Sequence, residues 1–219
     1  FCVLSGKICI MMWQSGSLFV DVVFFFLQAE AGIRDLVRSR GLGDVYKRQR
    51  DNRPGKPLIL AVEGFALAGG TEILQGTDIR VGAEDAVFGV TEVARGLYPM
   101  AGSTIRLRRQ IPYCIAAEIL LTGRHVSAQE ALAWGLINKV VPKGKTLEAA
   151  LEIAAQIGRN GPVAVRAVMK SLREHQECLD EADAMLRSDE VGWPVFATED
   201  AREGMKAFKE KRPAEFKGR

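Results

Sequence analysis

The segment KPLILAVEGFALAGGTEILQGTDIRVG, residues 56–82, decides the class of fold. Its apolar run at residues 58–62 is typical of a buried strand, and this run ends at Gly64. The glycine-rich residues that follow, 68–74, predict a turn that opens a helix, and residues 78–81 predict a second strand. A strand, a helix and a strand in this order predict an α/β fold.

The rest of the chain is mainly helical in pattern. A short strand is predicted over residues 86–88 and an edge strand over residues 136–141. The sequence SAQE at residues 127–130 has the S-x-x-E pattern of a capping box, so a helix should begin there and stop at Gly135. Residues 103–110, 112–121 and 180–191 have helical spacing. Three further helices, which are amphipathic in pattern, are predicted over residues 147–159, 162–174 and 200–211.

The chain changes character near Asp51. Residues 8–27 are apolar but interrupted, and Asp21 would lie inside the hydrocarbon of a membrane, so a signal peptide or membrane anchor fits poorly. Residues 29–49 have no periodic match to the later sequence and resemble read-through peptides at the ends of translated sequencing fragments. We therefore expect residues 1–50 to be artefactual or disordered and to pack poorly. A divergent but genuine N-terminal segment is the alternative.

Composition and charge narrow the class of protein. With 219 residues, 47% of them hydrophobic and 26% charged, the chain has the composition of an ordinary globular protein with one main domain. The net charge of +3 is carried by dispersed Lys and Arg residues, so nucleic acid is not an expected partner. A small anionic ligand is compatible with this charge.

The cysteines and histidines predict no metal site. Four cysteines lie far apart without metal or disulfide spacing, which indicates a reducing, cytoplasmic compartment: Cys2, Cys9, Cys114 and Cys178. Cys114 and Cys178 lack a nearby base and are expected to be packing residues. His125 and His175 lack carboxylate partners at ligand spacing and are expected on the surface.

Gly69 and Gly70 lie between the first predicted strand and the start of the helix. Free backbone N–H groups and the helix dipole converge at such a start and favour a negatively charged oxygen. Because they have no side chains, the two glycines let a ligand oxygen approach the backbone closely, as stabilisation of a developing oxyanion requires. A glycine pair that only makes a tight turn is the alternative that spacing leaves open.

Two carboxylates could work together near this turn. Glu72 lies in the first turn of the predicted helix, and Glu92 follows the strand predicted at residues 86–88. Carboxylates on separate elements can face one cavity and divide acid and base work if burial and repulsion shift their pKa values apart. As single residues, each could equally be a helix-start acid or a solvated surface charge.

Four stretches of the chain together resemble a known superfamily. They are residues 56–82, quoted above, AVFGVTEVARGLYPMAGSTIRL (86–107), LLTGRHVSAQEALAWGLINKVVP (120–142) and EDAREGMKAFKEKRPAEFKGR (199–219). In this order they are similar to the signatures of the crotonase, or enoyl-CoA hydratase/isomerase, superfamily, over about residues 54–219. The resemblance implies an α/β spiral of ββα turns, incomplete at the N-terminus, in residues 51–142. It also implies a helical oligomerisation region in residues 143–219.

The resemblance assigns roles to the residues around the turn. It implies that the Gly69 amide is an oxyanion-hole donor and that Glu72 and Glu92 are the two catalytic glutamates. It places the substrate-binding residues on the same turn, on the loop before residue 103 and on the last helix: Ala68, Gly70, Pro99, Phe208 and Lys211. Other basic residues of that last helix could equally form a solvated face.

The reaction that the resemblance implies is the reversible syn addition of water to a trans-2-enoyl-CoA. The product is a 3-hydroxyacyl-CoA, in fatty-acid or related acyl-CoA degradation. Both glutamates are present, which favours hydration over isomerisation. No cofactor and no membrane partner are expected, because CoA arrives with the acyl-CoA substrate. A homotrimer or a dimer of trimers is expected for the complete protein.

Two alternatives remain at this point. The first is a Δ3,Δ2-enoyl-CoA isomerase, in which one glutamate shuttles a proton. The second is a catalytically impaired fragment that acts only as a folding or oligomerisation unit. It is motivated by the family's upstream oxyanion donor, which comes from a turn of the S-A-G-x-D type, because nothing similar appears in residues 1–54. Loss of such a donor costs about 3 kcal/mol, so hydration by the chain as written should be slow.

Overall fold

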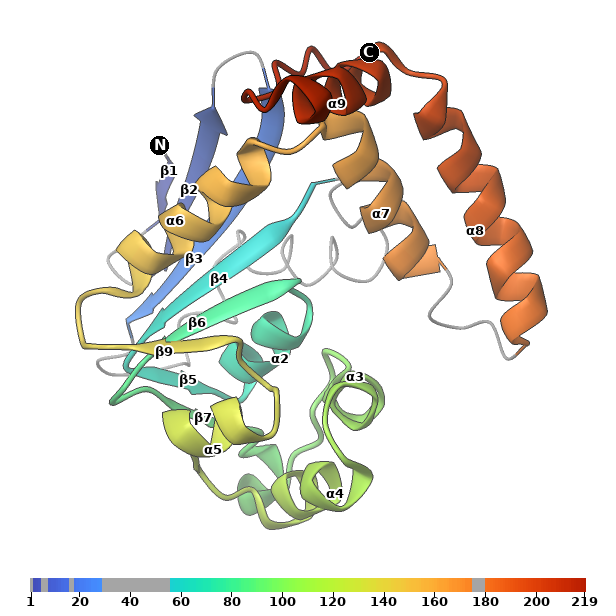
Figure 1. The fold of residues 1–219 in the computed structure, drawn as a ribbon. Helices are drawn as coiled ribbons and strands as arrows, with labels where there is room; N and C mark the ends of the chain where they lie inside the picture. The colour runs from blue at the N-terminus through green and yellow to red at the C-terminus, as the bar shows by residue number, and fades with distance from the viewer. Residues whose placement is uncertain (1, 5–7, 16–17, 29–55, 175–179) are drawn as a thin grey trace. The chain divides into compact units, whose positions relative to one another are not determined.

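The computed structural model describes residues 2–4, 8–15, 18–28, 56–174 and 180–219 (Figure 1). The chain divides into two compact units. The core unit comprises residues 1–12, 23–54 and 58–152, and the C-terminal unit comprises residues 13–22, 55–57 and 153–219. The glycine turn and the two glutamates lie in the core unit, whereas the last predicted helix lies in the C-terminal unit.

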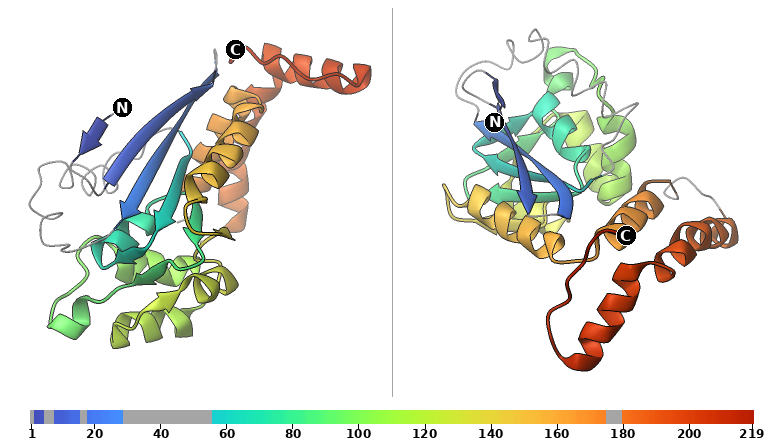
Figure 2. Two further views of the ribbon diagram at one scale, coloured as in Figure 1. Left: turned by 90° about the vertical axis from the view of Figure 1, so that its left-hand side faces the viewer. Right: turned by 90° about the horizontal axis from the view of Figure 1, so that it is seen from above.

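The larger sheet has mainly parallel strands, which run side by side in Figures 1 and 2. Their order is β1 (Cys2–Leu4), β2 (Ile8–Ser15), β3 (Leu18–Gln28), β4 (Leu58–Glu63), β6 (Ile79–Ala83) and β9 (Lys139–Val141). β1 and β2 are antiparallel, whereas β3–β4, β4–β6 and β6–β9 are parallel pairs. Every residue of β4 is buried, because a parallel strand is covered on both faces, and this explains its continuous apolar run. The strands predicted at 58–62 and 78–81 are confirmed, whereas the edge strand predicted at 136–141 is present only as β9, residues 139–141.

A smaller sheet joins β5 (Phe65–Leu67), β7 (Val87–Gly89) and β8 (Val126–Ser127). β5 is parallel to β7, and β7 is antiparallel to β8. Gly64 connects β4 to β5 with a φ of 76°, which favours glycine. β7 confirms the strand predicted at residues 86–88. β5 and β8 were not predicted, because two or three residues are too few to show a period.

Helices complete the core unit: α2 (Gly69–Gln75), the 3-10 helix η1 (Glu92–Arg95), α3 (Ser103–Gln110), α4 (Tyr113–Thr122) and α5 (Ala128–Ala133). The predicted capping box is confirmed, because the side chain of Ser127 accepts the Glu130 amide and Glu130 accepts the Ser127 amide in return. The helices and strands enclose one apolar core, whose larger members include Leu60, Leu74, Phe88, Leu107, Ile119, Leu136 and Ile137.

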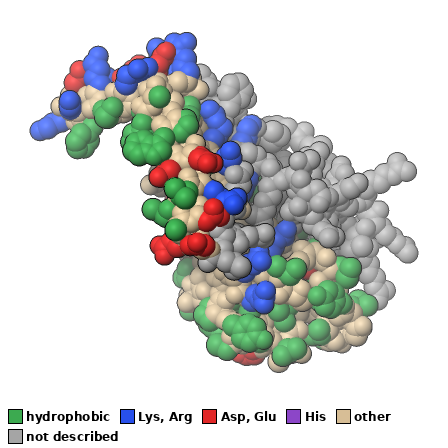
Figure 3. All heavy atoms as spheres, turned by 90° about the vertical axis from the view of Figure 1, so that its right-hand side faces the viewer, with side chains coloured by type: hydrophobic (Ala, Val, Ile, Leu, Met, Phe, Trp, Pro, Cys, Tyr) green, Lys and Arg blue, Asp and Glu red, His purple; other side chains and the backbone are tan. Residues whose placement is uncertain are grey.

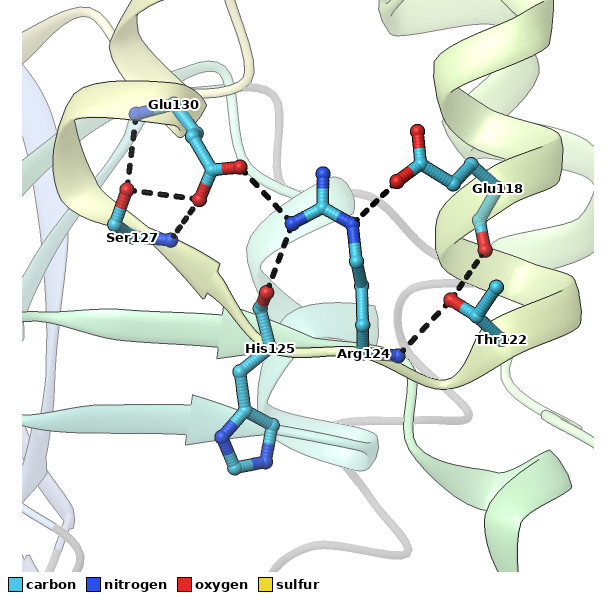
Figure 4. A network of polar contacts seen from close by, with 6 residues as sticks. All are labelled: Glu118, Thr122, Arg124, His125, Ser127 and Glu130. Carbon is cyan, nitrogen blue, oxygen red and sulfur yellow. Dashed lines mark hydrogen bonds and ion pairs between the residues drawn. The ribbon is translucent and has the colours of Figure 1, made fainter.

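Arg124 ties the end of α4 to the start of α5 (Figure 4). Its guanidinium donates to Glu118 at 2.7 Å, to Glu130 at 2.9 Å and to the carbonyl oxygen of His125 at 3.0 Å. It also lies 5.3 Å from the ring of Trp134, within the range of a cation–π contact. These contacts of Arg124 hold the segment that leads into β8. The side chain of His125 is exposed, as predicted.

Glu63, at the end of β4, caps the N-terminus of α6 (Thr146–Gly158). Its buried carboxylate accepts the amide of Gly144 at 3.1 Å, the amide of Thr146 at 3.3 Å and the Thr146 hydroxyl at 2.6 Å. The first amides of a helix have no partner within the helix and carry partial positive charge, so a carboxylate stabilises them. The contact joins residues that are 81 and 83 positions apart in the sequence.

The C-terminal unit contains α7 (Pro162–Glu174), α8 (Glu181–Phe196) and α9 (Glu199–Glu210). The helices predicted in this region are confirmed, and α8 continues five residues beyond the predicted end at residue 191 (196 − 191 = 5). After α9 the chain folds back, because the buried carboxylate of Asp200 accepts the amides of Lys217 at 2.6 Å and Gly218 at 2.8 Å.

Large apolar side chains are exposed on α8 and α9. Figure 3 shows hydrophobic side chains standing among acidic and basic ones on these helices. The largest of them are Met185, Leu186, Trp193, Phe196, Met205 and Phe208. Exposed apolar groups of this size are typical of a surface that another chain covers, and the expected oligomerisation region in residues 143–219 stays a prediction.

The start of the chain differs from the sequence-based expectation. No element was predicted before residue 51, yet residues 2–4, 8–15 and 18–28 form strands, and β3 pairs with β4. The run LFVDVVFFFLQ of β3 is rich in β-branched and aromatic residues, which favour strands. Residues 29–55 lie outside the described residues, so the boundary at residue 51 stays a prediction. No helix in the described ranges is both long and apolar enough to cross a membrane.

Candidate active site

A strained turn sets the position of α2. Ala68 has a φ of 51° and a ψ of −121°, a conformation that residues with a side chain rarely adopt. The turn persists because the Ala68 amide donates to the carbonyl of Gly89 at 2.7 Å, while the Ala68 carbonyl accepts the amide of Glu72 at 3.1 Å. Gly69 therefore begins the helix directly beside β7.

Thr71 locks this turn between the two short strands. Its buried hydroxyl lies against the carbonyl oxygens of Ala66 on β5 and Gly89 on β7. It also accepts the amide of Gly89 at 3.0 Å. A side chain that bonds both strands fixes the direction in which the first amides of α2 point.

Within the described part of the chain, the Gly69 amide is left available to a ligand. It is the first N–H of α2, and the first amides of a helix have no partner within it. Among the described residues no acceptor binds it, and the N-cap residue Ala68 has no side-chain oxygen to offer. The arrangement matches the predicted oxyanion donor, whose role stays a prediction.

Glu72 is held at the start of α3. It is only 4% exposed, and its Oε1 accepts the amides of Ala101 at 2.9 Å and Ser103 at 3.2 Å. Burial raises the pKa of the Glu72 carboxyl above its usual value of 4.5, and the nearby charge of Glu92 raises it further, while the hydrogen bonds from Ser103 and Ala101 lower it. Burial and the neighbouring carboxylate thus make the Glu72 carboxyl a weaker acid than an exposed glutamate, as is common for groups at functional sites.

Glu92 is the first residue of η1 and is partly buried. Its Oε2 is enclosed and has no hydrogen-bond partner among the described residues. Burial raises the pKa of the Glu92 carboxyl, against the lowering effects of its own amide and of Arg95. The charge of Glu92 acts on Glu72, so the structure brings the two predicted glutamates together. Their shared work on one water stays a prediction.

The other predicted site residues fall in two places. Ala68 and Gly70 belong to the strained turn, and buried Pro99 lies two positions before Ala101, the donor to Glu72. Phe208 and Lys211 lie instead on α9 and at its C-cap, in the C-terminal unit, where Phe208 is 85% exposed. The contact of these two residues with CoA stays a prediction.

The cysteine and histidine predictions have mixed outcomes. Cys114 is exposed in the first turn of α4, so the prediction of a packing residue is wrong. The helix is apolar along most of its length, so its sequence does not indicate which side faces solvent, and a single cysteine carries no periodic signal. Cys178 and His175 lie outside the described residues.

Three residues of the site were not predicted from the sequence: Ala101, Ser103 and Gln75. Ala101 and Ser103 donate backbone amides, which leave no trace in residue type. Gly102 between them has a φ of 107°, so the sequence Ala-Gly-Ser was a signal for a turn that aims successive amides at one point. Gln75 is buried and polar at the end of a short helix, a combination that spacing alone does not interpret.

Ala68→Gly should raise the free energy of unfolding by about 1 kcal/mol. Glycine occupies the φ and ψ of residue 68 without a steric penalty, and its greater freedom in the unfolded chain offsets part of the gain. Urea unfolding of the two proteins measures the difference. A lower free energy for the glycine variant would show that the turn does not strain alanine.

Glu92→Gln should stabilise the fold at neutral pH. The pKa of Glu92 is raised above 4.5 in the folded state, so ionising this group opposes folding as the pH rises through the folded pKa. The variant's advantage should therefore be largest above the folded pKa and should vanish below about pH 4.5, where Glu92 is protonated in both states. Thermal unfolding between pH 4 and 8 tests this, and an advantage that does not change with pH would contradict it.

Comparison with known proteins identifies the family. Residues 44–219 match the family described as enoyl-CoA hydratase/isomerase. The chain is 54% identical over 170 residues to the enoyl-CoA hydratase EchA19 of Mycobacterium tuberculosis, which covers 78% of this chain and 64% of that protein. It is 40% identical over 203 residues to the 2,3-dehydroadipyl-CoA hydratase of Escherichia coli, covering 89% of this chain and 78% of that protein. The chain therefore spans less than two thirds of the length of EchA19.

Solved structures show the same fold. A putative enoyl-CoA hydratase/isomerase of Mycobacterium abscessus is 36% identical and superposes with a TM-score of 0.80, over 96% of this chain and 99% of that chain. The enoyl-CoA hydratase of Bacillus anthracis is 29% identical with a TM-score of 0.83, over 98% of this chain and 100% of that chain. The α/β crotonase fold expected from the sequence is confirmed. Because the family match covers residues 44–219 and the solved structures share the fold, the chain belongs to the enoyl-CoA hydratase/isomerase family of the crotonase superfamily.

Proposed function

We propose that this protein is an enoyl-CoA hydratase, which adds water reversibly and in syn fashion to a trans-2-enoyl-CoA. One observation carries the proposal: two carboxyl groups with raised pKa values, Glu72 and Glu92, lie near each other in the unit that presents the free Gly69 amide. Addition of water needs one group that accepts a proton and one that donates it. A buried glutamate pair can share these tasks near neutral pH.

In the proposed mechanism, each proton transfer involves one of the two glutamates. The Gly69 amide donates to the thioester oxygen as the enolate forms, and it stabilises negative charge that is absent from the bound substrate. One glutamate takes a proton from water as the oxygen bonds to carbon 3 of the acyl group. The other glutamate gives its proton to carbon 2, which yields the 3-hydroxyacyl-CoA. A proton exchange between the glutamates and solvent restores the starting state.

Relatives support this direction of chemistry. The matched curated proteins are named as hydratases, in M. tuberculosis and E. coli, and as carnitinyl-CoA dehydratases, in Proteus and Salmonella. Hydration and dehydration are one reaction read in two directions. An enoyl-CoA isomerase is the second candidate, because the family description covers both activities and an isomerase needs a single glutamate.

The test is the fate of the conjugated double bond. Hydration removes the absorbance of a trans-2-enoyl-CoA and yields a product heavier by one water, which mass spectrometry detects. An isomerase instead moves the double bond of a 3-enoyl-CoA into conjugation, so absorbance appears and the mass is unchanged. The proposal fails if crotonyl-CoA and longer 2-enoyl-CoA substrates give no hydrated product while a 3-enoyl-CoA gains conjugation.

The proposal also covers the substrate, the cofactor requirement, the assembly and the location of the protein. The substrate is an acyl-CoA thioester, and no cofactor is needed because CoA arrives with the acyl group. The exposed apolar residues of α8 and α9 support a homotrimer as the working assembly. The dispersed cysteines support a cytoplasmic location. Light scattering of the purified protein measures the assembly.

A further inference from the structure

Two buried polar side chains continue the Glu72 site into the interior. Gln75 lies three residues after Glu72 on α2, so the two side chains share one face of the helix. The Nε2 of Gln75 donates to Oγ of Ser103 at 2.9 Å, and Ser103 is the first residue of α3. Gln75 is 1% exposed and Ser103 is 0% exposed, so bulk water does not compete for this contact.

Ser103 contacts Glu72 in two ways. Its backbone amide donates to Oε1 of Glu72 at 3.2 Å, and its hydroxyl, on the same residue, lies near enough to the Glu72 carboxyl to lower the pKa of that group. The Ala101 amide donates to Oε1 as well, at 2.9 Å. The backbone amides would hold the carboxylate whatever residue stood at position 103, whereas the hydroxyl contact depends on serine.

The chemistry of Gln75, Ser103 and Glu72 favours one arrangement of the hydrogens between them. An ionised carboxylate only accepts, an amide nitrogen only donates, and a serine hydroxyl has one hydrogen to give. Because Gln75 donates to Ser103, the hydroxyl hydrogen of Ser103 is available for Glu72. If the Gln75 amide were turned over, its oxygen would take that hydrogen and the carboxylate would lose a donor.

The backbone of Gln75 is fixed independently of its side chain. Two groups donate to its carbonyl oxygen, the guanidinium of Arg80 at 3.4 Å and Nε2 of Gln110 at 2.9 Å. Arg80 and Glu92 are thus the charged groups that reach this chain of contacts, the first at the Gln75 carbonyl and the second at Glu72. Among the described residues the Gln75 side chain has a single partner, Ser103, because its Oε1 is buried without one.

We propose that Gln75 is a positioning residue for Glu72 and acts through the Ser103 hydroxyl. The amide of Gln75 orients the hydroxyl, and the hydroxyl holds the carboxylate of Glu72 in its ionised form. A carboxylate that is already oriented needs no rearrangement when the proton moves, which favours turnover more than substrate binding. In its effect on turnover this inference rests on the proposed hydratase function.

A matched pair of variants isolates the contact. Gln75→Met removes the donor at nearly constant volume, together with the unpartnered Oε1. Gln110→Met is the control, because it also removes an amide donor and an unpartnered buried Oε1 beside Gln75 but does not touch Ser103. Ser103→Ala and the double variant Gln75→Met with Ser103→Ala complete the set.

The first measurement is a titration of the Glu72 carboxyl by NMR in the whole chain, with ¹³C-labelled glutamate and assignment through Glu72→Gln. A hydrogen bond to the ionised form lowers a pKa, so its loss should raise the Glu72 pKa by about 0.5–1 unit in Gln75→Met and in Ser103→Ala. The double variant should shift no further than Ser103→Ala, because the amide acts only through the hydroxyl. Gln110→Met should leave the titration unchanged.

The second measurement is the pH dependence of hydration. Gln75→Met should lower kcat several-fold with KM unchanged, and the limb of the kcat profile that Glu72 sets should move by the same amount as the titration. An unshifted titration in Gln75→Met, or a double variant whose shift is the sum of the two single shifts, would overturn the inference. If methionine at residue 75 prevents folding, Gln75→Asn provides the comparison, because its amide is one methylene too short to reach Ser103.

Failure of this inference and failure of the hydratase assignment give different results. The titration needs no turnover, so a protein that hydrates nothing but shows the expected shifts would contradict only the proposed function. A protein that hydrates enoyl-CoA normally but shows no coupling between residues 75 and 103 would contradict only the positioning role of Gln75.

Discussion

Glu92→Gln should lower kcat for enoyl-CoA hydration by about 10²–10⁴-fold while the protein remains folded. Glutamine keeps the shape of the side chain but neither takes nor gives the proton that hydration requires. The buried Oε2 of Glu92 has no hydrogen-bond partner among the described residues, so the substitution breaks no contact at this atom. Stopped-flow loss of crotonyl-CoA absorbance measures the effect, and circular dichroism checks the fold.

Further variants distinguish a joint catalytic role of Glu72 and Glu92 from a non-specific loss of activity. Glu72→Gln should have an effect of similar size, and the double variant should be little worse than either one, because groups that act as a unit are not additive. Glu84→Gln is the control, since Glu84 is an exposed glutamate of the same unit. If Glu92→Gln kept more than about a tenth of the activity, an isomerase-like mechanism with one glutamate would fit better.

Gly69→Pro should lower kcat by about 10²–10³-fold with a smaller effect on KM. Proline removes the N–H that is proposed to stabilise the enolate. The missing N–H has no partner within the helix, so proline breaks no helical hydrogen bond at this position. Proline also restricts the backbone of the residue before it, so circular dichroism of the variant must show that the fold around Ala68 is kept. The measurement is steady-state hydration of crotonyl-CoA by the variant and the parent protein.

Gly69→Ala distinguishes a lost donor from added bulk. It places a methyl group at the same residue and keeps the amide, so it should retain much more activity than the proline variant. Equal losses in the two variants would show that crowding, and not the hydrogen bond, explains the effect. Near-normal turnover by Gly69→Pro would mean that the enolate oxygen is bound elsewhere.

The sequence predicted the longer elements of this fold because their periods repeat. α3 and α7 have the predicted bounds, and β4 was recognised by its unbroken apolar run. Short elements such as β5 and η1 depend on tertiary contacts and carry no such pattern. The first strands were dismissed because their apolar run is interrupted, although strand pairing does not require an uninterrupted run.

The site was predictable only in part for a related reason. Glu72, Glu92 and Gly69 were found through the resemblance of whole stretches, since each residue alone also had a purely structural explanation. Ser103 lies 31 positions from Glu72 and meets it only when α2 and α3 pack together. Contacts over such separations are set by the fold, so residue type and spacing could not indicate that Gln75 and Ser103 support the carboxylate.

The cap that Glu63 places on α6 has a consequence for folding of the chain during its synthesis on the ribosome. Glu63, at the end of β4, is synthesised 83 positions before Thr146, whose hydroxyl and amide donate to the Glu63 carboxylate. At about 5–20 residues per second, the nascent chain waits roughly 4–17 s for that partner. Until then the apolar strand and its neighbour β6 have no β9 to cover the sheet edge, since β9 begins only at residue 139. We therefore expect the yield of folded protein to depend more on chaperone protection during synthesis than on the free energy of unfolding of the finished protein.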